Sequence, residues 1–327
     1  MPARSLRLAV FPCLLCCILL AVPVAALARG QAAAGPAPTQ IPQLDGGIEI
    51  DGSIDEAAWQ QAARIDLEYE FNPGDNIPAP VETTLRMGYT PDALYLAFDA
   101  RDPDPAKIRA HLTDRDGAFN DDFVGVMLDT FDDQRRAYEI FVNPLGVQMD
   151  LVREEATGNE DPSWDGLWTS AGRITPDGYQ VEIRIPFSTL RFRDTAGERR
   201  WGVIAYRNYP RELRYQLANV VVARGGNCLM CQADKVEGMA GIEQGRNLEV
   251  VPTVTVTDVQ TRDTRDGEWH GEGLQVEPGV DVSWAPTPNL TLNATLNPDF
   301  SQVESDQAQL DLSSNFALYF PEKRPFF

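Results

Sequence analysis

The sequence predicts an all-β protein whose main unit is an antiparallel β-sandwich. Three observations lead to this fold class. Residues 121–152 contain three short alternating runs joined by tight turns. Residues 179–185 alternate strictly between apolar and polar side chains, which is typical of a strand with one buried face. Further short alternating runs at 83–89, 93–100 and 201–209 are separated by segments rich in turn residues.

The segment 121–152 is expected to form a meander at the centre of the sandwich. Its first strand, 123–129, is apolar on both faces and should be buried between two layers. A second run, 138–142, follows a five-residue turn. Residues 143–146 read Asn-Pro-Leu-Gly and predict a type I turn, because Pro is at the second position and Gly at the fourth.

The ordered part of the chain is expected to begin with a strand and turn at 48–52. Residues 53–59 then predict a short helix that turns Trp59 into the core. The runs 83–89 and 93–100 read as a hairpin, because Thr-Pro-Asp separates them.

The first 28 residues have the features of a secretory signal peptide. Arg4 and Arg7 precede an apolar run from Leu8 to Val24, and Ala26-Leu27-Ala28 supplies small residues for cleavage. Residues 29–43 are rich in Ala, Pro and Gln and predict a disordered linker. We therefore expect an exported protein of the periplasm or outer membrane.

Charge and cysteine content restrict the partners further. The formal net charge of −21 argues against nucleic-acid binding and against adhesion to anionic lipid headgroups. Only Cys228 and Cys231 lie outside the signal segment. In an exported protein this spacing favours a local disulfide over half of a metal site, because no second cysteine pair completes four ligands.

The character of the sequence changes at residue 246. The runs 248–257, 276–284 and 290–296 are longer than the earlier ones and place Thr, Asn and Asp on the second face, a pattern typical of outer-membrane barrel strands. Three strands are fewer than the roughly eight that such a barrel needs. We therefore expect residues 246–327 to be the start of a barrel-like region and the chain to be a piece of a longer protein.

Two blocks of the sequence resemble known families. Residues 51–59 (DGSIDEAAW), 94–96, 122–129, 143–146 and 182–187 (EIRIPF) resemble the family 9 carbohydrate-binding-module-like domain, assigned here to 44–245. Residues 296–304 and 320–327 are similar to the domain of unknown function 5916. The resemblance implies an antiparallel β-sandwich that binds glycans, takes part in carbohydrate catabolism and carries structural Ca²⁺.

Candidate site residues follow from these expectations. Trp164 and Trp168 lie together in the loop 156–172 and could stack on a sugar, while Asp161, Asp165 and Arg153 could contact its hydroxyl groups. Carboxylates on loops are the ligands that Ca²⁺ requires. The candidate calcium ligands are Asp102, Asp114, Asp116, Asp121 and Asp122.

The sequence contains no recognisable catalytic motif. No pair of carboxylates stands out as acid and base, and neither histidine, His111 or His270, has a nucleophile motif nearby. We therefore expect non-catalytic glycan recognition. Two alternatives stay open: a structural or assembly module of an outer-membrane barrel that binds no sugar, and part of an O-glycosyl hydrolase whose active site lies outside this chain.

Overall fold

The computed structural model describes residues 37–193, 197–242, 248–262, 267, 269–287 and 290–297. These residues form an all-β protein, which confirms the predicted fold class. The signal peptide predicted for residues 1–28, the motif at 320–327 and all but the first two residues of the motif at 296–304 lie outside the described residues. No helix in the described part of the chain is long and apolar enough to cross a membrane.

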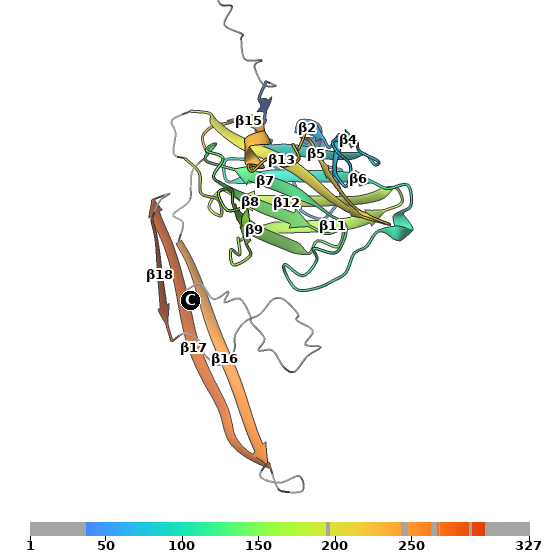
Figure 1. Cartoon of the computed structure of the whole chain (residues 1–327). Helices are drawn as coiled ribbons and strands as arrows, with labels where there is room; N and C mark the ends of the chain where they lie inside the picture. Colours follow the sequence, from blue (N-terminus) through green and yellow to red (C-terminus); the bar gives the residue numbers. More distant parts are fainter. Residues whose placement is uncertain are drawn as a thin grey trace, which may run out of the picture. The chain divides into compact units, whose positions relative to one another are not determined.

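The main unit is a sandwich of two sheets (Figure 1). The larger sheet follows the order β10-β9-β8-β7-β13-β14-β3-β4, and β15 pairs with both β13 and β1. Its strands, in chain order, are β1 (Thr39–Gln40), β3 (Tyr69–Asn72), β4 (Ile77–Pro78), β7 (Phe123–Asp129), β8 (Arg136–Val142), β9 (Gln148–Glu154), β10 (Asn159–Asp161), β13 (Arg199–Pro210), β14 (Arg214–Ala218) and β15 (Asp234–Met239).

The smaller sheet follows the order β11-β12-β6-β5-β2. Its strands are β2 (Ala63–Asp66), β5 (Thr83–Tyr89), β6 (Ala93–Arg101), β11 (Thr169–Thr175) and β12 (Gly178–Pro186). The loop expected at 156–172 therefore contains β10 and the start of β11. Three short 3-10 helices complete the unit: η1 (Ala57–Gln60), η2 (Pro105–Lys107) and η3 (Met230–Gln232).

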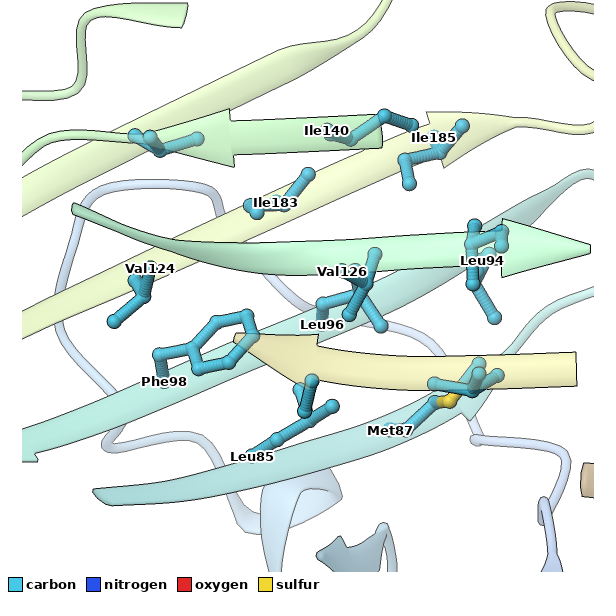
Figure 2. Packing of buried hydrophobic residues seen from close by; sticks show 14 of the residues in the cluster. Leu85, Met87, Leu94, Leu96, Phe98, Val124, Val126, Ile140, Ile183 and Ile185 are labelled. Carbon is cyan, nitrogen blue, oxygen red and sulfur yellow. The ribbon is translucent and has the colours of Figure 1, made fainter. Parts of the chain in front are cut away.

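The core lies between the two sheets, where the alternating residues of both inner faces meet (Figure 2). Leu94, Leu96 and Phe98 of β6 are fully buried, as are Val124 and Val126 of β7. The strand β7 is apolar on its outer face as well, since Phe123 and Met127 belong to a second buried cluster with Phe141 and Tyr206. The prediction of a central meander strand buried on both sides is therefore confirmed.

The predicted turns and the predicted helix are present. The amide of Gly146 donates to the carbonyl of Asn143 at 3.0 Å, which closes the turn between β8 and β9. Trp59 lies in η1 and is 1% exposed, in a third buried cluster on the outer side of the smaller sheet.

The ordered chain begins earlier than predicted. The sequence predicts a disordered linker over residues 29–43, but Thr39 and Gln40 pair with Val236 and Glu237 of β15. Ile41 is 2% exposed because it packs into the main core. The segment is ordered because it pairs with the edge of β15 and buries Ile41 in the core. Its Ala/Pro/Gln-rich composition does not reveal these long-range interactions.

Residues from 248 onward form a separate three-stranded antiparallel sheet. Its strands are β16 (Leu248–Arg262), β17 (Trp269–Thr287) and β18 (Leu290–Leu296). They include the three long alternating runs that the sequence shows, and the pairing places their apolar residues opposite one another. Val250 faces Val282, and Val256 faces Val276.

Candidate functional site

A cleft of about 510 Å³ lies where the chain leaves β6 and where the β13–β14 hairpin turns. A cleft of this volume is in the range that takes a small ligand. Aromatic, charged and proline side chains share its wall: Pro80, Pro103, Asp104, Lys107, Arg109, Tyr209, Pro210, Arg211, Glu212 and Tyr215.

Arg211 is held in the wall of the cleft by two buried carboxylates. Asp102 follows β6 and Asp122 precedes β7, and both carboxylates are fully buried. Arg211 donates from Nη1 to Oδ2 of Asp122 at 2.8 Å and from Nη2 to Oδ2 of Asp102. Two ion pairs, with carboxylates that flank different strands, therefore fix the guanidinium.

A second arginine, Arg207, lies near the same carboxylate, Asp102. Arg207 of β13 is fully buried, and its Nη1 donates to Oγ1 of Thr83 at 2.8 Å and to the carbonyl of Arg101 at 2.9 Å. Its Nη2 is 3.9 Å from Oδ2 of Asp102. The network of Arg207, Arg211, Asp102 and Asp122 thus contains two positive and two negative groups.

Burial and pairing act in opposite directions on these groups. Burial raises the pKa of Asp122, and the hydrogen bond from Arg211 opposes that rise only in part. For Arg211, burial works to lower the pKa, but the ion pairs with Asp122 and Asp102 outweigh burial and raise it. Arg211 therefore stays charged and serves as a fixed cation at the base of the cleft.

Two tyrosines supply the aromatic surface of the cleft. The guanidinium carbon of Arg211 is 4.0 Å from the ring centroid of Tyr209, which is 8% exposed. The ring of Tyr215 lies 6.0 Å from that of Tyr209 with an interplanar angle of 42°. Tyr209 is covered by Arg211, whereas Tyr215 is only half-buried. Tyr215 thus presents the more accessible aromatic face.

The predicted stacking platform is wrong for Trp168. Its ring is 6% exposed and belongs to the main core, and its Nε1 donates to Oδ2 of the buried Asp150 at 3.1 Å. Trp164 is half-buried and packs against Tyr138, with ring centroids 4.7 Å apart. Trp168 therefore lacks the open face that a sugar ring needs, whereas a platform at the half-buried Trp164 stays a prediction.

The polar residues predicted beside those tryptophans already have partners within the protein. Asp161 lies in β10, and its Oδ1 accepts from the amide of Ser163. Asp165 is 3.2 Å from Nε of Arg115. Arg153 of β9 donates to the buried Glu139 at 2.6 Å and also pairs with Glu160.

Glu139 is 2% exposed on the outer face of the larger sheet. Burial raises its pKa to about 7, although the neighbouring Arg153 acts to lower it. Arg153 is therefore engaged in an ion-pair cluster and is not free to contact a ligand.

The five aspartates predicted as calcium ligands do not come together. Asp102 and Asp122 pair with Arg211, which would repel a cation. Asp121 accepts from the amide and from Nδ1 of His111, at 2.7 and 2.6 Å. Asp114 is exposed, and Asp116 accepts from the amide of Asp150 at 2.9 Å. The predicted set therefore does not fit a calcium site.

A different carboxylate group brings Asp116, Asp150 and Asp165 within 4.8 Å of one another. Arg115 lies in this group, donating to Oδ1 of Asp150 at 2.8 Å and pairing with Asp165 at 3.2 Å. Its guanidinium supplies the positive charge that the carboxylates need, so the arrangement is explained without a metal.

Cys228 and Cys231 are joined in a disulfide, with Cα atoms 5.4 Å apart. The helix η3, which contains Cys231, buries Met230 against the outer face of the larger sheet. The disulfide thus lies in a segment that covers the second apolar cluster.

Sequence reasoning missed the cleft because its walls come from three segments that are distant in the chain. One local signal was present: residues 207–211 place Arg, Tyr, Pro and Arg at the end of a strand, where a hairpin must turn. The sequence pattern predicts metal ligands at Asp102 and Asp122, which are the partners of those arginines in the structure.

Comparison with known proteins agrees with this fold. The model of the carbohydrate family 9 binding domain-like family matches residues 50–205, and that of the domain of unknown function DUF5916 matches residues 248–327. A search of curated proteins found no match.

Several solved structures are similar at low sequence identity. One is a putative carbohydrate-binding protein from Bacteroides uniformis, with 13% identity and a TM-score of 0.47, covering 61% of this chain and 98% of that chain. Another is a family 9 carbohydrate-binding module from Caldicellulosiruptor kristjanssonii in complex with cellotriose, with 15% identity, a TM-score of 0.44, and coverage of 62% and 93%. On the two family matches, the chain carries a carbohydrate family 9 binding domain-like domain at residues 50–205, followed by a DUF5916 domain at residues 248–327.

Proposed function

We propose that this protein is a non-catalytic glycan-binding protein and that the cleft beside Tyr209 and Arg211 is its binding site. The observation that carries the proposal is the half-buried ring of Tyr215 in a cleft lined by fixed charged groups. A flat aromatic ring suits the C–H face of a sugar, and few precisely placed polar groups suffice to orient a small ligand. The match to a carbohydrate-binding-domain family supports the same function.

The polar groups of the cleft suit sugar hydroxyls. Asp104 and Glu212 supply carboxylate acceptors, and Lys107 and Arg109 supply donors. Neighbouring hydroxyls on a pyranose can each donate and accept, so a mixture of both kinds of group can bind them. Arg211 is already paired with two carboxylates and holds the wall in place.

The test is isothermal titration of the full chain with short neutral and acidic oligosaccharides. Tyr215→Ala should lower the affinity at least about tenfold if stacking contributes about 1.4 kcal/mol or more. The matched control is Tyr69→Ala, because Tyr69 is also half-buried but does not line the cleft. Unchanged affinity in Tyr215→Ala would remove the cleft as the site. If the wild-type chain binds none of the glycans, the alternative of a purely structural module is favoured.

We further propose that the protein is exported and serves carbohydrate catabolism in the periplasm or at the outer membrane. The basic residues, the apolar run and the Ala-Leu-Ala motif of residues 1–28 support export, as does the disulfide. The mature chain should then begin at Arg29. N-terminal sequencing of protein purified from the cell envelope tests this, and a retained Met1 would contradict it.

The sheet formed by β16, β17 and β18 supports an outer-membrane location. One face of the sheet is apolar and exposed, with Val254 66% and Leu274 72% exposed. Other exposed apolar residues of these strands are Leu248, Val250, Val256, Val276, Trp284, Leu292 and Leu296. Thr253, Thr255 and Thr257 alternate with the valines of β16. An exposed apolar surface of this extent is typical of an interaction site, and in an outer-membrane barrel such a face contacts lipid.

Fractionation of cells that express the full-length protein tests this location. The protein should sediment with the outer membrane and resist extraction with high salt. Replacing Val254 and Val256 by Asp should release it, because charged residues on a lipid-facing surface cost about 2–4 kcal/mol each near the bilayer centre. Recovery of the wild-type protein in the soluble periplasmic fraction would overturn the membrane proposal and leave the glycan proposal standing.

A further inference from the structure

The charged groups that line the cleft are not equally engaged. Nζ of Lys107 pairs with Oδ2 of Asp104 at 3.1 Å. Arg211 pairs with both Asp102 and Asp122. These cations already have carboxylate partners, so neither needs an anion from a ligand.

Arg109 differs from the other cations. Its guanidinium donates from Nη2 to the carbonyl of Arg211 at 2.9 Å. Among the described residues, no carboxylate lies within ion-pair distance of it. A guanidinium has five N–H donors, so most of the donors of Arg109 are left for water or a ligand. The side chain is exposed on the wall of the cleft.

The backbone of Arg109 is fixed in place. Its amide donates to Oδ2 of Asp122 at 2.8 Å, and the amide of Asp122 donates back to the Arg109 carbonyl at 2.9 Å. Oδ2 of Asp122 also accepts from Arg211 at 2.8 Å. The same carboxylate thus positions the backbone of Arg109 and the guanidinium of Arg211. A site on an anchored backbone orients its ligand better than one on a free loop.

We infer that the cleft takes an acidic glycan, a polymer or oligomer of uronic acids, and that Arg109 binds the ligand carboxylate. The inference rests on the proposed function, because it assigns the ligand class of the same cleft. A planar guanidinium binds a carboxylate through two parallel hydrogen bonds, and this arrangement is stronger and more specific than a single one. The carboxylate of a uronic acid projects from the edge of the sugar ring, so the ring can lie on Tyr215 while its carboxylate reaches the wall of the cleft.

Glu212 provides an internal check on this assignment. It lines the same cleft, is exposed, and has no ion-pair partner among the described residues. The negative charge there repels an acidic ligand, whereas with a neutral ligand the carboxylate can only accept hydrogen bonds. Removing the charge of Glu212 should therefore have the opposite effect from removing the charge of Arg109.

The experiment titrates the full chain with trigalacturonate and with its methyl ester. The ester keeps the sugar rings but removes their charges. Arg109→Gln should lower the affinity for the acid at least about tenfold and change that for the ester less than about twofold. Glu212→Gln should raise the affinity for the acid about two- to threefold. The control is Arg64→Gln, an equal change of net charge at an exposed residue outside the cleft, which should leave both affinities unchanged.

Each outcome decides a specific statement. Equal wild-type affinity for acid and ester would overturn the acidic-glycan inference while leaving glycan binding intact. A preference for the acid that Arg109→Gln does not reduce would overturn the role of Arg109. If neither ligand binds and no neutral glycan binds, both the inference and the proposed function fall. Thermal melting of every variant confirms that an affinity change is not a loss of fold, since both substituted residues are exposed.

Discussion

Glu182 accepts a hydrogen bond from the indole nitrogen of Trp59 at 2.9 Å, although the two residues are 123 positions apart. The other carboxylate oxygen of Glu182 accepts from the amides of Asp51 and Gly52 at 3.0 and 2.9 Å. One buried carboxylate thus joins the segment 51–59 to β12. The motifs at 51–59 and at 182–187 are therefore in direct contact in the folded protein.

Replacing Glu182 by Ala should destabilise the sandwich by roughly 2–4 kcal/mol, because it leaves three donors without their acceptor in a buried place. Urea unfolding followed by tryptophan fluorescence measures the change. Glu68→Ala is the control, because Glu68 is exposed and its side chain has no partner among the described residues. Equal stability of the two variants would show that the Glu182 contacts contribute nothing.

Gly52 should be sensitive to substitution for two separate reasons. Its φ of +86° disfavours any residue with a Cβ, and an added Cβ would lie 3.0 Å from the carbonyl carbon of Gly172. Gly158 has a φ of +68° but open space around it. We expect Gly158→Ala to cost about 1–2 kcal/mol from the backbone alone and Gly52→Ala to cost more. The difference in unfolding free energy between Gly52→Ala and Gly158→Ala measures the cost of the contact between the added Cβ and Gly172. Equal free energies would show that this contact costs nothing.

Trp168→Ala should cost roughly 3–5 kcal/mol of stability, because the indole is packed in the core. It also removes one of the hydrogen bonds that the Asp150 carboxylate accepts. Trp164→Ala should cost less, since that ring is only half-buried. Neither substitution should change glycan affinity in the cleft beyond about twofold. If Trp168→Ala folds well but loses glycan binding, the hypothesis that Trp168 stacks on the sugar would be supported after all.

Glu139 should make stability depend on pH near neutrality. Its pKa is about 7 in the folded protein, above the ordinary value of 4.5, because burial disfavours the charged form. The folded state therefore binds more protons than the unfolded state between these values, and stability falls as pH rises from about 4.5 to about 7.

Glu139→Gln should remove this dependence. The free energy of unfolding of the variant minus that of the wild type should be higher at pH 8 than at pH 4, by on the order of 1–3 kcal/mol. Urea unfolding at the two pH values measures the change. Glu160→Gln serves as control, because Glu160 contacts the same Arg153 but is largely exposed. If the free energy of unfolding of Glu139→Gln depends on pH as steeply as that of the wild type, other groups cause the pH dependence.

The sequence alone determined the local features of this protein. The strict alternation at 179–185 and the apolar run at 123–129 predicted strands with the burial that the structure shows. Successive side chains of a strand point to opposite faces, so consecutive residues are enough to predict which face is buried. The Asn-Pro-Leu-Gly turn and the pairing of Cys228 with Cys231 likewise depend on residues close in the chain. The motifs at 51–59 and 182–187 indicated the domain family, which the family model then matched.

Only the tertiary structure decided which residues form the site. Trp168 resembled a loop tryptophan in the sequence, but β11 begins at the next residue and the ring meets Asp150 of β9 in the core. Asp102 and Asp122 resembled metal ligands, but the β13–β14 turn brings Arg211 between them. Arg109 is fixed by Asp122 across a sequence separation of 13. Strand pairing and register set these contacts, and both depend on interactions between distant segments that the local pattern of the chain does not encode.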